Sequence, residues 1–214
     1  MYLVDLLIPP GCVGCHRRGA LLCQRCRTTI RPAFDDRDRF VIPDAGAVTG
    51  DTLRCALAAC AYDGPMRSAL KALKYTGVRR MAPILAELAV PTLARVAAIA
   101  GRATLVPVPI HAERRAARGY NQAELLATEL GRRTGLAVAD MLERSHATVK
   151  QHRLNRTSRL ANLRGAFVAH GRAPTVAILV DDIVTTSATL EACAGALAAG
   201  GCAAVYGVAV AREI

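Results

Sequence analysis

Two adjacent acids and a run of hydroxyl side chains stand out in the stretch ILVDDIVTTSATL, which begins at residue 178. Asp181 and Asp182 follow an apolar run that predicts a buried strand, and the hydroxyl residues after them are Thr185, Thr186, Ser187 and Thr189. Paired carboxylates can hold two adjacent sugar hydroxyls and stabilise a developing positive carbon. Hydroxyls and N–H groups at a helix start can bind an anion. The pattern predicts a ribose 5-phosphate site; an acid pair that caps a helix in an ordinary α/β domain is the alternative.

Four cysteines near the amino terminus form a second candidate site. The stretch GCVGCHRRGALLCQRC contains two C-x-x-C pairs, made by Cys12, Cys15, Cys23 and Cys26. Each pair can aim two thiolates at one ion, and two pairs complete the tetrahedral sulfur site that zinc prefers. Because four thiolates leave no position for water, the expected role is structural. Disulfides or redox thiols are the alternative, which a reducing compartment disfavours.

Basic residues gather in two segments, and the formal net charge is +11. Pro107 and Pro109 fix a turn that is followed by Arg114, Arg115 and Arg118. From residue 144 to residue 172 there are seven Lys or Arg and no acid, and four of the seven are spaced by three at Lys150, Arg153, Arg156 and Arg159. The charge predicts a polyanionic partner such as nucleic acid, membrane phosphate or a small polyphosphate. A solvated helix face is the alternative for each segment.

Strands and helices alternate along most of the chain. The apolar runs predict strands at 53–62, 103–110, 136–142, 166–169, 175–181 and 202–211. Helical spacing and helix stop signals predict helices at 65–77, 78–99, 121–135 and 187–201, with Asn121 capping the third and a bend near Pro91. Continuous apolar strands between helices imply a mostly parallel sheet covered on both faces. Neither G-x-G-x-x-G nor a G-K-[ST] loop occurs, which argues against dinucleotide and P-loop nucleotide folds.

The chain of 214 residues has room for one domain and a small appendage. We expect a four-cysteine module at 1–30, a linker at 31–51 and the main domain at 52–214. The opening MYLVDLLIPP is short, is broken by Asp5 and lacks a basic start, so it predicts neither a signal peptide nor a membrane span. We therefore expect a cytoplasmic protein without membrane insertion. The remaining cysteines are expected to be small core residues, at Cys55, Cys60, Cys193 and Cys202.

The acid pair and its hydroxyl run resemble the phosphoribosyl pyrophosphate signature of type I phosphoribosyltransferases, although Ser187 stands where that signature usually has glycine. The stretches YDGPMRSALKALKYTG, VPVPIHAERRAARGYNQAELLA and VDDIVTTSATL resemble, in order, three blocks of the ComF-type phosphoribosyltransferase-like proteins. In this chain, as in the ComF-type proteins, a four-cysteine module precedes the three blocks. The resemblance covers nearly the whole chain and implies a type I phosphoribosyltransferase-like fold, with a mostly parallel twisted sheet, helices on both faces and a zinc-ribbon-like module.

The resemblance also implies a function: transfer of ribose 5-phosphate from phosphoribosyl pyrophosphate to a nitrogen acceptor, with release of pyrophosphate. Asp181 and Asp182 would then hold the ribose and stabilise its carbon. The 5-phosphate would bind at Thr185, Thr186, Ser187, Ala188 and Thr189. The pyrophosphate would meet Val108, Pro109 and Arg118 in one loop, and Lys150, Gln151, Arg159 and Asn162 in a second that closes over it. Mg²⁺ would be held largely by substrate oxygens and water.

A protein that keeps this site without catalysis is the alternative. It would sense a nucleotide or bind single-stranded DNA or partner proteins in DNA uptake, called competence. The net charge, the cysteine module and Ser187 favour it, whereas the small number of aromatic residues, three Phe and five Tyr, disfavours base stacking. Lys71 and Lys74 share a helix face, and Tyr75 adds an aromatic near a possible base site; their ligand is left open.

Overall fold

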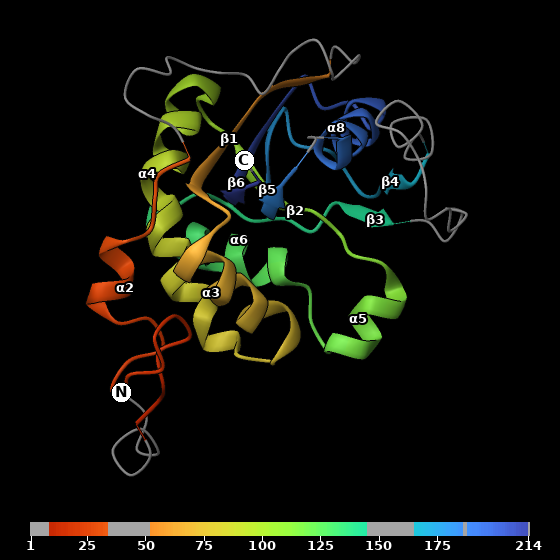
Figure 1. Ribbon diagram of the computed structural model, residues 1–214. Helices are drawn as coiled ribbons and strands as arrows, with labels where there is room; N and C mark the ends of the chain where they lie inside the picture. The colour runs from red at the N-terminus through yellow and green to blue at the C-terminus, as the bar shows by residue number, and fades with distance from the viewer. Residues whose placement is uncertain (1–8, 34–51, 145–164, 186–187, 214) are drawn as a thin grey trace.

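Four strands form one parallel sheet in the order β1-β6-β5-β2 (Figure 1). They are β1 (Leu53–Ala61), β2 (Thr104–Pro107), β5 (Val176–Val184) and β6 (Ala204–Arg212). This computed structural model describes residues 9–33, 52–144, 165–185 and 188–213. The strands consist mostly of Ala, Val, Leu and Ile because both faces of the sheet are covered. The predicted α/β class is confirmed, and the architecture is that of a phosphoribosyltransferase-like domain behind a cysteine cluster.

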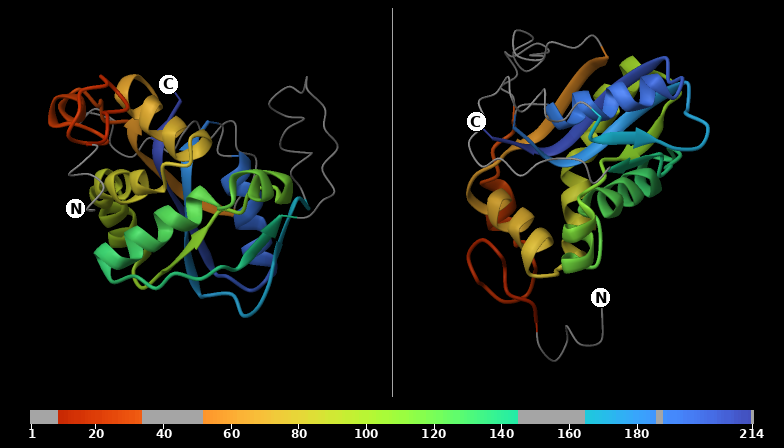
Figure 2. Two further views of the ribbon diagram at one scale, coloured as in Figure 1. Left: turned by 90° about the horizontal axis from the view of Figure 1, so that it is seen from below. Right: turned by 90° about the vertical axis from the view of Figure 1, so that its right-hand side faces the viewer.

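Helices cover the two faces of the sheet unequally (Figure 2). One face carries α3 (Gly64–Tyr75), α4 (Ala82–Ala100) and α6 (Gln122–Thr134), and the other carries α8 (Ala188–Ala199). Side chains alternate along β5 between the two layers: Ile178 and Val180 join the first, and Ala177 and Leu179 join the second. The segment from Arg31 to Ala33 lies antiparallel along β1 and covers that edge of the sheet.

The α4 helix forms much of the larger core. A 3₁₀ turn (Arg79–Met81) precedes it, and together they are long and apolar enough by length and composition to cross a membrane, with a mean hydropathy of 1.5. In the structure Leu85, Leu93 and Val96 are fully buried in the core that α4 forms with β1, β6 and α6. These contacts are those of a core helix.

Two short strands lie outside the main sheet, and the second falls within the predicted strand at 166–169. β3 (Leu142–Arg144) and β4 (Phe167–Ala169) form an antiparallel ribbon that packs against α8. Their buried residues Leu142 and Phe167 belong to the smaller core layer. The predicted strand at 136–142 gives only a bridge from Val138 to Leu105. The proposed division at residues 30 and 51 stays a prediction, because residues 34–51 lie outside the described ranges.

A buried carboxylate connects α8 to the start of β1. Glu191 is 9% exposed, and its carboxylate oxygens accept hydrogen bonds from the backbone N–H groups of Thr52 at 3.3 Å and Leu53 at 3.0 Å. Backbone N–H groups removed from water need acceptors, and the Glu191 carboxylate supplies them here. Glu191 therefore holds the first residues of the main domain on the sheet.

We expect Glu191→Ala to lower the free energy of unfolding by about 2–3 kcal/mol, because it leaves two N–H groups without their acceptor. Glu191→Gln keeps one carbonyl acceptor and should cost less. Chemical denaturation followed by circular dichroism measures both. Equal stability of the Ala and Gln variants would contradict this role for the carboxylate.

Candidate functional site

The acid pair lies inside β5, whereas the sequence predicted that the strand ends there. β5 continues to Val184 because β6 runs beside it as far as Arg212, which pairs with Val184. On the other side, β2 ends with Pro107 opposite Val180. Asp181 and Asp182 are therefore the first residues of β5 beyond the end of β2.

This position is a topological switch point. From β2 the chain passes into α5 (Ala112–Arg118) and then α6, which lies on the larger core layer. From β5 it passes into α8 on the opposite face. A crevice opens where successive parallel strands send the chain to opposite faces, and such crevices are where open α/β sheets bind ligands. The fold thus places the acid pair where a ligand site is expected.

Asp182 is buried and paired with a lysine. It is 3% exposed, and its Oδ2 lies 2.5 Å from Nζ of Lys74 at the end of α3. Nε2 of Gln122, the first residue of α6, donates to Oδ1 at 3.5 Å. A buried carboxylate is stable when it is paired and hydrogen-bonded, and Lys74 and Gln122 supply these two contacts to Asp182.

Asp181 is the member of the pair that holds a proton more tightly than usual. Burial raises the pKa of Asp181 well above its usual value of 3.8, and the charge and side-chain hydrogen bond of Asp182 raise it further. Its Oδ1 accepts from the backbone N–H of Asp182 at 2.8 Å. Two adjacent carboxylates repel each other, so the protonated form of one of them is favoured.

The stretch RGYNQ explains how the β2 side of the site is built. Gly119 ends α5 with a φ of 77°, a left-handed conformation that favours glycine. The hydroxyl of buried Tyr120 donates to the backbone oxygen of Leu73, next to Lys74. Asn121 accepts from Ala123 N at 3.0 Å, which confirms the predicted cap.

The same Asn121 side chain holds the loop after β2. Its Nδ2 donates to the backbone oxygen of Val108 at 2.9 Å, and Val108 N donates to Val180 O at 2.9 Å. Pro109 follows in this loop and lines a smaller cavity on its α5 side. Val108 and Pro109 are thus fixed directly beside the acid pair.

A larger pocket opens between the end of α3 and α5. It has a volume of about 620 Å³ and is lined by Lys74, Tyr75, Gly77, Arg114, Ala117 and Arg118. Arg118 donates through Nη1 to Oε1 of Gln122, the residue that also contacts Asp182. Its guanidinium carbon lies 5.6 Å from the centre of the Tyr75 ring. The pocket and the acid pair therefore share Lys74, and the Gln122 side chain links Arg118 of the pocket to Asp182.

The structure describes the predicted phosphate turn only in part. Thr185 is exposed directly after β5, Ala188 begins α8 and is buried, and Thr189 follows in the first turn. The other predicted phosphate-binding residues lie outside the described ranges: Thr186, Ser187, Lys150, Gln151, Arg159 and Asn162. Their positions stay predictions.

Sequence reasoning missed Gln122 and left Lys74 without a ligand. A signal for Lys74 was present, since it lies four residues after Leu70 and eight after Met66 on the buried face of α3. A lysine on an apolar helix face needs a buried acid. Which acid it meets depends on the tertiary fold, which joins residues 74 and 182.

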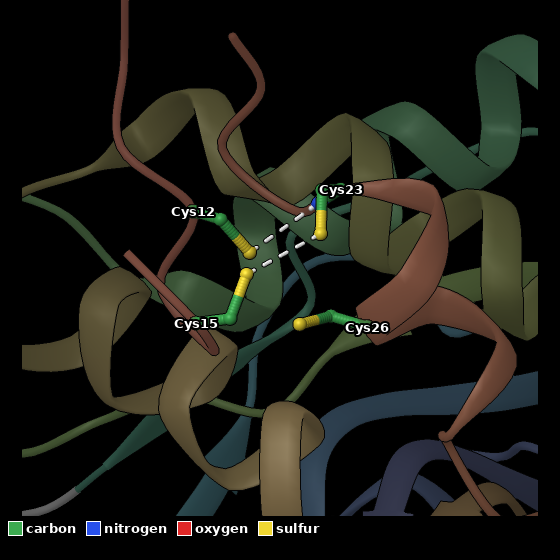
Figure 3. A group of neighbouring side chains, drawn as sticks. All are labelled: Cys12, Cys15, Cys23 and Cys26. Carbon is green, nitrogen blue, oxygen red and sulfur yellow. Dashed lines mark hydrogen bonds between the residues drawn. The ribbon is translucent and has the colours of Figure 1, made fainter. Parts of the chain in front are cut away.

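The four cysteines converge as the sequence predicted (Figure 3). Their sulfur atoms all lie within 4.8 Å of one another, and those of Cys15 and Cys23 are 3.6 Å apart. A tetrahedral zinc–thiolate site with bonds of about 2.3 Å needs sulfur atoms about 3.8 Å apart. Backbone N–H groups directed at Cys12, with that of Cys23 at 3.4 Å, outweigh its burial and lower its pKa to about 6. The cluster fits a structural zinc ion.

The cysteine cluster is joined to the main domain through α4. Cys12, Leu22 and Cys26 form a small core against which Ile84 and Leu88 of α4 pack. Cys26 lies in a short helix, α2 (Gln24–Thr28). A residue of the same helix, Arg27, pairs with Glu87 of α4 at 3.0 Å, and this pairing lowers the pKa of Glu87.

Among the described residues, the cysteine cluster is the single group of three or more potential metal ligands. The acid pair offers only two carboxyls, and one of them is paired with Lys74, so it makes no cage for Mg²⁺. Magnesium usually binds proteins through few carboxylates together with substrate phosphates and water. The site is compatible with Mg²⁺ only as part of such a substrate complex.

We expect the purified protein to contain about one zinc ion per chain, because the four sulfurs fit one tetrahedral ion. Cys15→Ser should release most of it. Cys55→Ser, which changes a cysteine of the sheet, should retain it. Inductively coupled plasma mass spectrometry measures the metal, and undiminished zinc in Cys15→Ser would contradict the assignment.

The raised pKa of Asp181 predicts a pH dependence of stability. Since the folded state binds this proton more tightly than the unfolded state, the stabilising contribution is full below pH 3.8 and is lost as pH rises through the folded pKa. Asp181→Asn removes this loss, so the variant should gain stability relative to the native protein as pH rises. Denaturant unfolding across pH 4 to 8 measures the difference, with Glu129→Gln, a partly exposed acid of α6, as the control. A difference independent of pH would contradict the shift.

Comparison with known proteins gives several relatives, while no protein-family model matches the chain. DNA utilization protein YhgH of Salmonella typhi is 32% identical over 153 residues, which is 67% of this chain and 66% of the relative. Competence protein F of Haemophilus influenzae is 36% identical over 92 residues, 41% of this chain and 40% of the relative. The matched region is thus just under two thirds of the first relative's length. These similarities, together with the four-cysteine cluster before the α/β domain, show that the chain belongs to the ComF family of phosphoribosyltransferase-like proteins.

Proposed function

We propose that this protein acts in DNA uptake and utilization, and that its chemistry is Mg²⁺-dependent phosphoribosyl transfer to a nitrogen acceptor. The names of its relatives, competence protein and DNA utilization protein, support the DNA-related role. One observation carries the chemistry: the acid pair stands at the switch point between β2 and β5, beside a pocket whose charged side chains are all basic among the described residues. Phosphoribosyl pyrophosphate combines the diol and the phosphates that such a site can bind.

The acid pair would hold the ribose. The carboxyl oxygens of Asp181 and Asp182 can accept hydrogen bonds from the ribose hydroxyls. Because the pKa of Asp181 is raised, a proton held there can also be donated to a ribose oxygen. With Lys74 balancing Asp182, the ribose is recognised mainly through hydrogen bonds.

The 5-phosphate would bind at the turn that leads into α8, through Thr185, Thr186, Ser187, Ala188 and Thr189. The twelve residues of α8 give its N-terminus a partial positive charge directed at an anion. Ser187 replaces the usual glycine and can give its hydroxyl to the phosphate. The support for this step is the order of residues after β5.

The pyrophosphate would lie on the β2 side of the acid pair. Val108 and Pro109 form the loop there, and Arg118 supplies a cation at the pocket wall. Lys150, Gln151 and Arg159 belong to the basic segment that we propose closes over the leaving group. When bound with the substrate, Mg²⁺ would neutralise part of the pyrophosphate charge.

The transfer forms one bond and breaks one. A nitrogen lone pair attacks C1 of the ribose, and the C1–oxygen electron pair leaves with pyrophosphate. A proton is lost from the nitrogen to solvent or buffer. The negative charge of Asp182 would stabilise the cationic carbon as the leaving bond breaks, and closure over the site would keep water from the same carbon.

A second candidate function is a non-catalytic sensor that keeps phosphoribosyl pyrophosphate bound and acts through DNA or partner proteins. The DNA-related names of the relatives and the exposed, basic pocket favour it. The two functions share the ligand and differ in the release of pyrophosphate. Screening nitrogen bases for pyrophosphate release therefore separates them once binding is established.

We expect calorimetry to detect binding of phosphoribosyl pyrophosphate with Mg²⁺ to the zinc-loaded protein. The double variant Asp181→Asn, Asp182→Asn should weaken it at least about 100-fold, a loss of about 2.7 kcal/mol, because both ribose contacts change. Glu129→Gln is the matched control, since it changes a partly exposed acid of α6, paired with Arg132, in the same chemical way. Unchanged affinity in the double variant would exclude the acid pair from the site.

A further inference from the structure

The pocket between α3 and α5 is lined by positively charged side chains, with no negatively charged one among its described lining residues. Its ionisable lining residues are Lys74, Arg114 and Arg118, together with Tyr75, and no carboxylate is among the described lining residues. Its volume of about 620 Å³ lies within the range of small-molecule sites, roughly 300–1,000 Å³. The pocket is therefore large enough for a ring with a charged substituent.

The charge of the pocket is positive even after its contacts are counted. Lys74 is balanced by Asp182 at 2.5 Å. Arg118 donates to the neutral amide of Gln122, which leaves the arginine charge uncancelled by that bond. An anionic group would gain from Arg118 and Arg114 together, and arginine binds carboxylates and phosphates through paired N–H donors.

The exposed aromatic gives the pocket a flat wall. Tyr75 is 74% exposed although it is a large side chain, and its ring lies beside the Arg118 guanidinium at 5.6 Å. A planar heterocycle can stack on such a ring and also on a guanidinium plane. Pyrophosphate has no planar ring to stack on Tyr75, so this aromatic wall would not contribute to its binding.

The pocket is also connected to the proposed ribose site by side-chain contacts. Lys74 belongs to both, and Arg118 reaches Asp182 through Gln122 in two hydrogen bonds. A ligand in the pocket therefore lies next to the acid pair. This is the position that a nitrogen nucleophile needs for attack on a ribose held by Asp181 and Asp182.

We propose that this pocket is the acceptor site and that its ligand is an anionic, planar nitrogen heterocycle, such as a ring bearing a carboxylate. This inference rests on the proposed function, which leaves the acceptor open. Tyr75 stacks on the ring, and Arg118 with Arg114 binds its negative group. In this proposal Arg118 is assigned to the acceptor rather than to the pyrophosphate, which keeps the loop of Val108 and Pro109. Lys74 remains paired with Asp182 and lies between the acceptor and the ribose.

The test uses two isosteric probes, pyridine-3-carboxylate and pyridine-3-carboxamide, titrated calorimetrically into the full zinc-loaded chain. The carboxylate should bind at least about tenfold more tightly, because only it carries the charge that the arginines recognise. Arg118→Gln should abolish this preference, and Tyr75→Ala should weaken both probes, whereas Tyr75→Phe should retain their binding. Arg132→Gln, an exposed change on α6, is the matched control for the loss of a positive charge.

Equal affinity for the two probes, or affinity that survives both Arg118→Gln and Tyr75→Ala, would overturn the proposal. So would displacement of the carboxylate by inorganic pyrophosphate, since the pocket would then be the site of the leaving group. Binding of an oligothymidylate that is lost in Tyr75→Ala, without binding of the carboxylate, would assign the pocket to nucleic acid instead. Titration with phosphoribosyl pyrophosphate is run separately, so failure there with carboxylate binding intact would overturn only the ribose site.

Discussion

The buried charge of Asp182 constrains the whole carboxyl end of the sheet. A carboxylate that is 3% exposed needs a cation nearby, and Lys74 supplies it from another part of the chain. This pairing fixes the end of α3 over β5. Gln122 and Tyr120 then attach the start of α6 to the same place, through Asp182 and the backbone of Leu73. Because a buried ion pair often adds little to the free energy of unfolding, we assign the Lys74–Asp182 pair the role of positioning the site.

The rest of the molecule supports that arrangement from both sides. The α4 helix fills the larger core layer and carries the cysteine module on its outer surface through Ile84 and Leu88. On the opposite face, α8 holds the start of β1 through Glu191. The module lies on α3 and α4, away from α8, so a metal there acts on the fold and leaves the acid pair to bind ligand (Figure 1).

Sequence patterns predicted what depends on local spacing. The two C-x-x-C pairs predicted the cysteine cluster, the apolar runs predicted the parallel sheet, and the position of Asn121 predicted a helix cap, which its contact with Ala123 confirms. Contacts between distant segments were not predictable in this way. The end of β5 was placed too early because its extension depends on pairing with β6. The raised pKa of Asp181 likewise follows from burial and from the charge of Asp182 beside it, and the burial cannot be read from residue spacing alone.

The central claim is that Lys74 and the acid pair form a ribose site for phosphoribosyl pyrophosphate. A crystal structure of the protein with this compound and Mg²⁺ tests it most directly. We predict that the ribose hydroxyls lie within about 2.6–3.2 Å of the carboxyl oxygens of Asp181 and Asp182, with the Lys74 contact intact. A ligand bound elsewhere, or a Lys74 side chain drawn away from Asp182 to the pyrophosphate, would contradict the account.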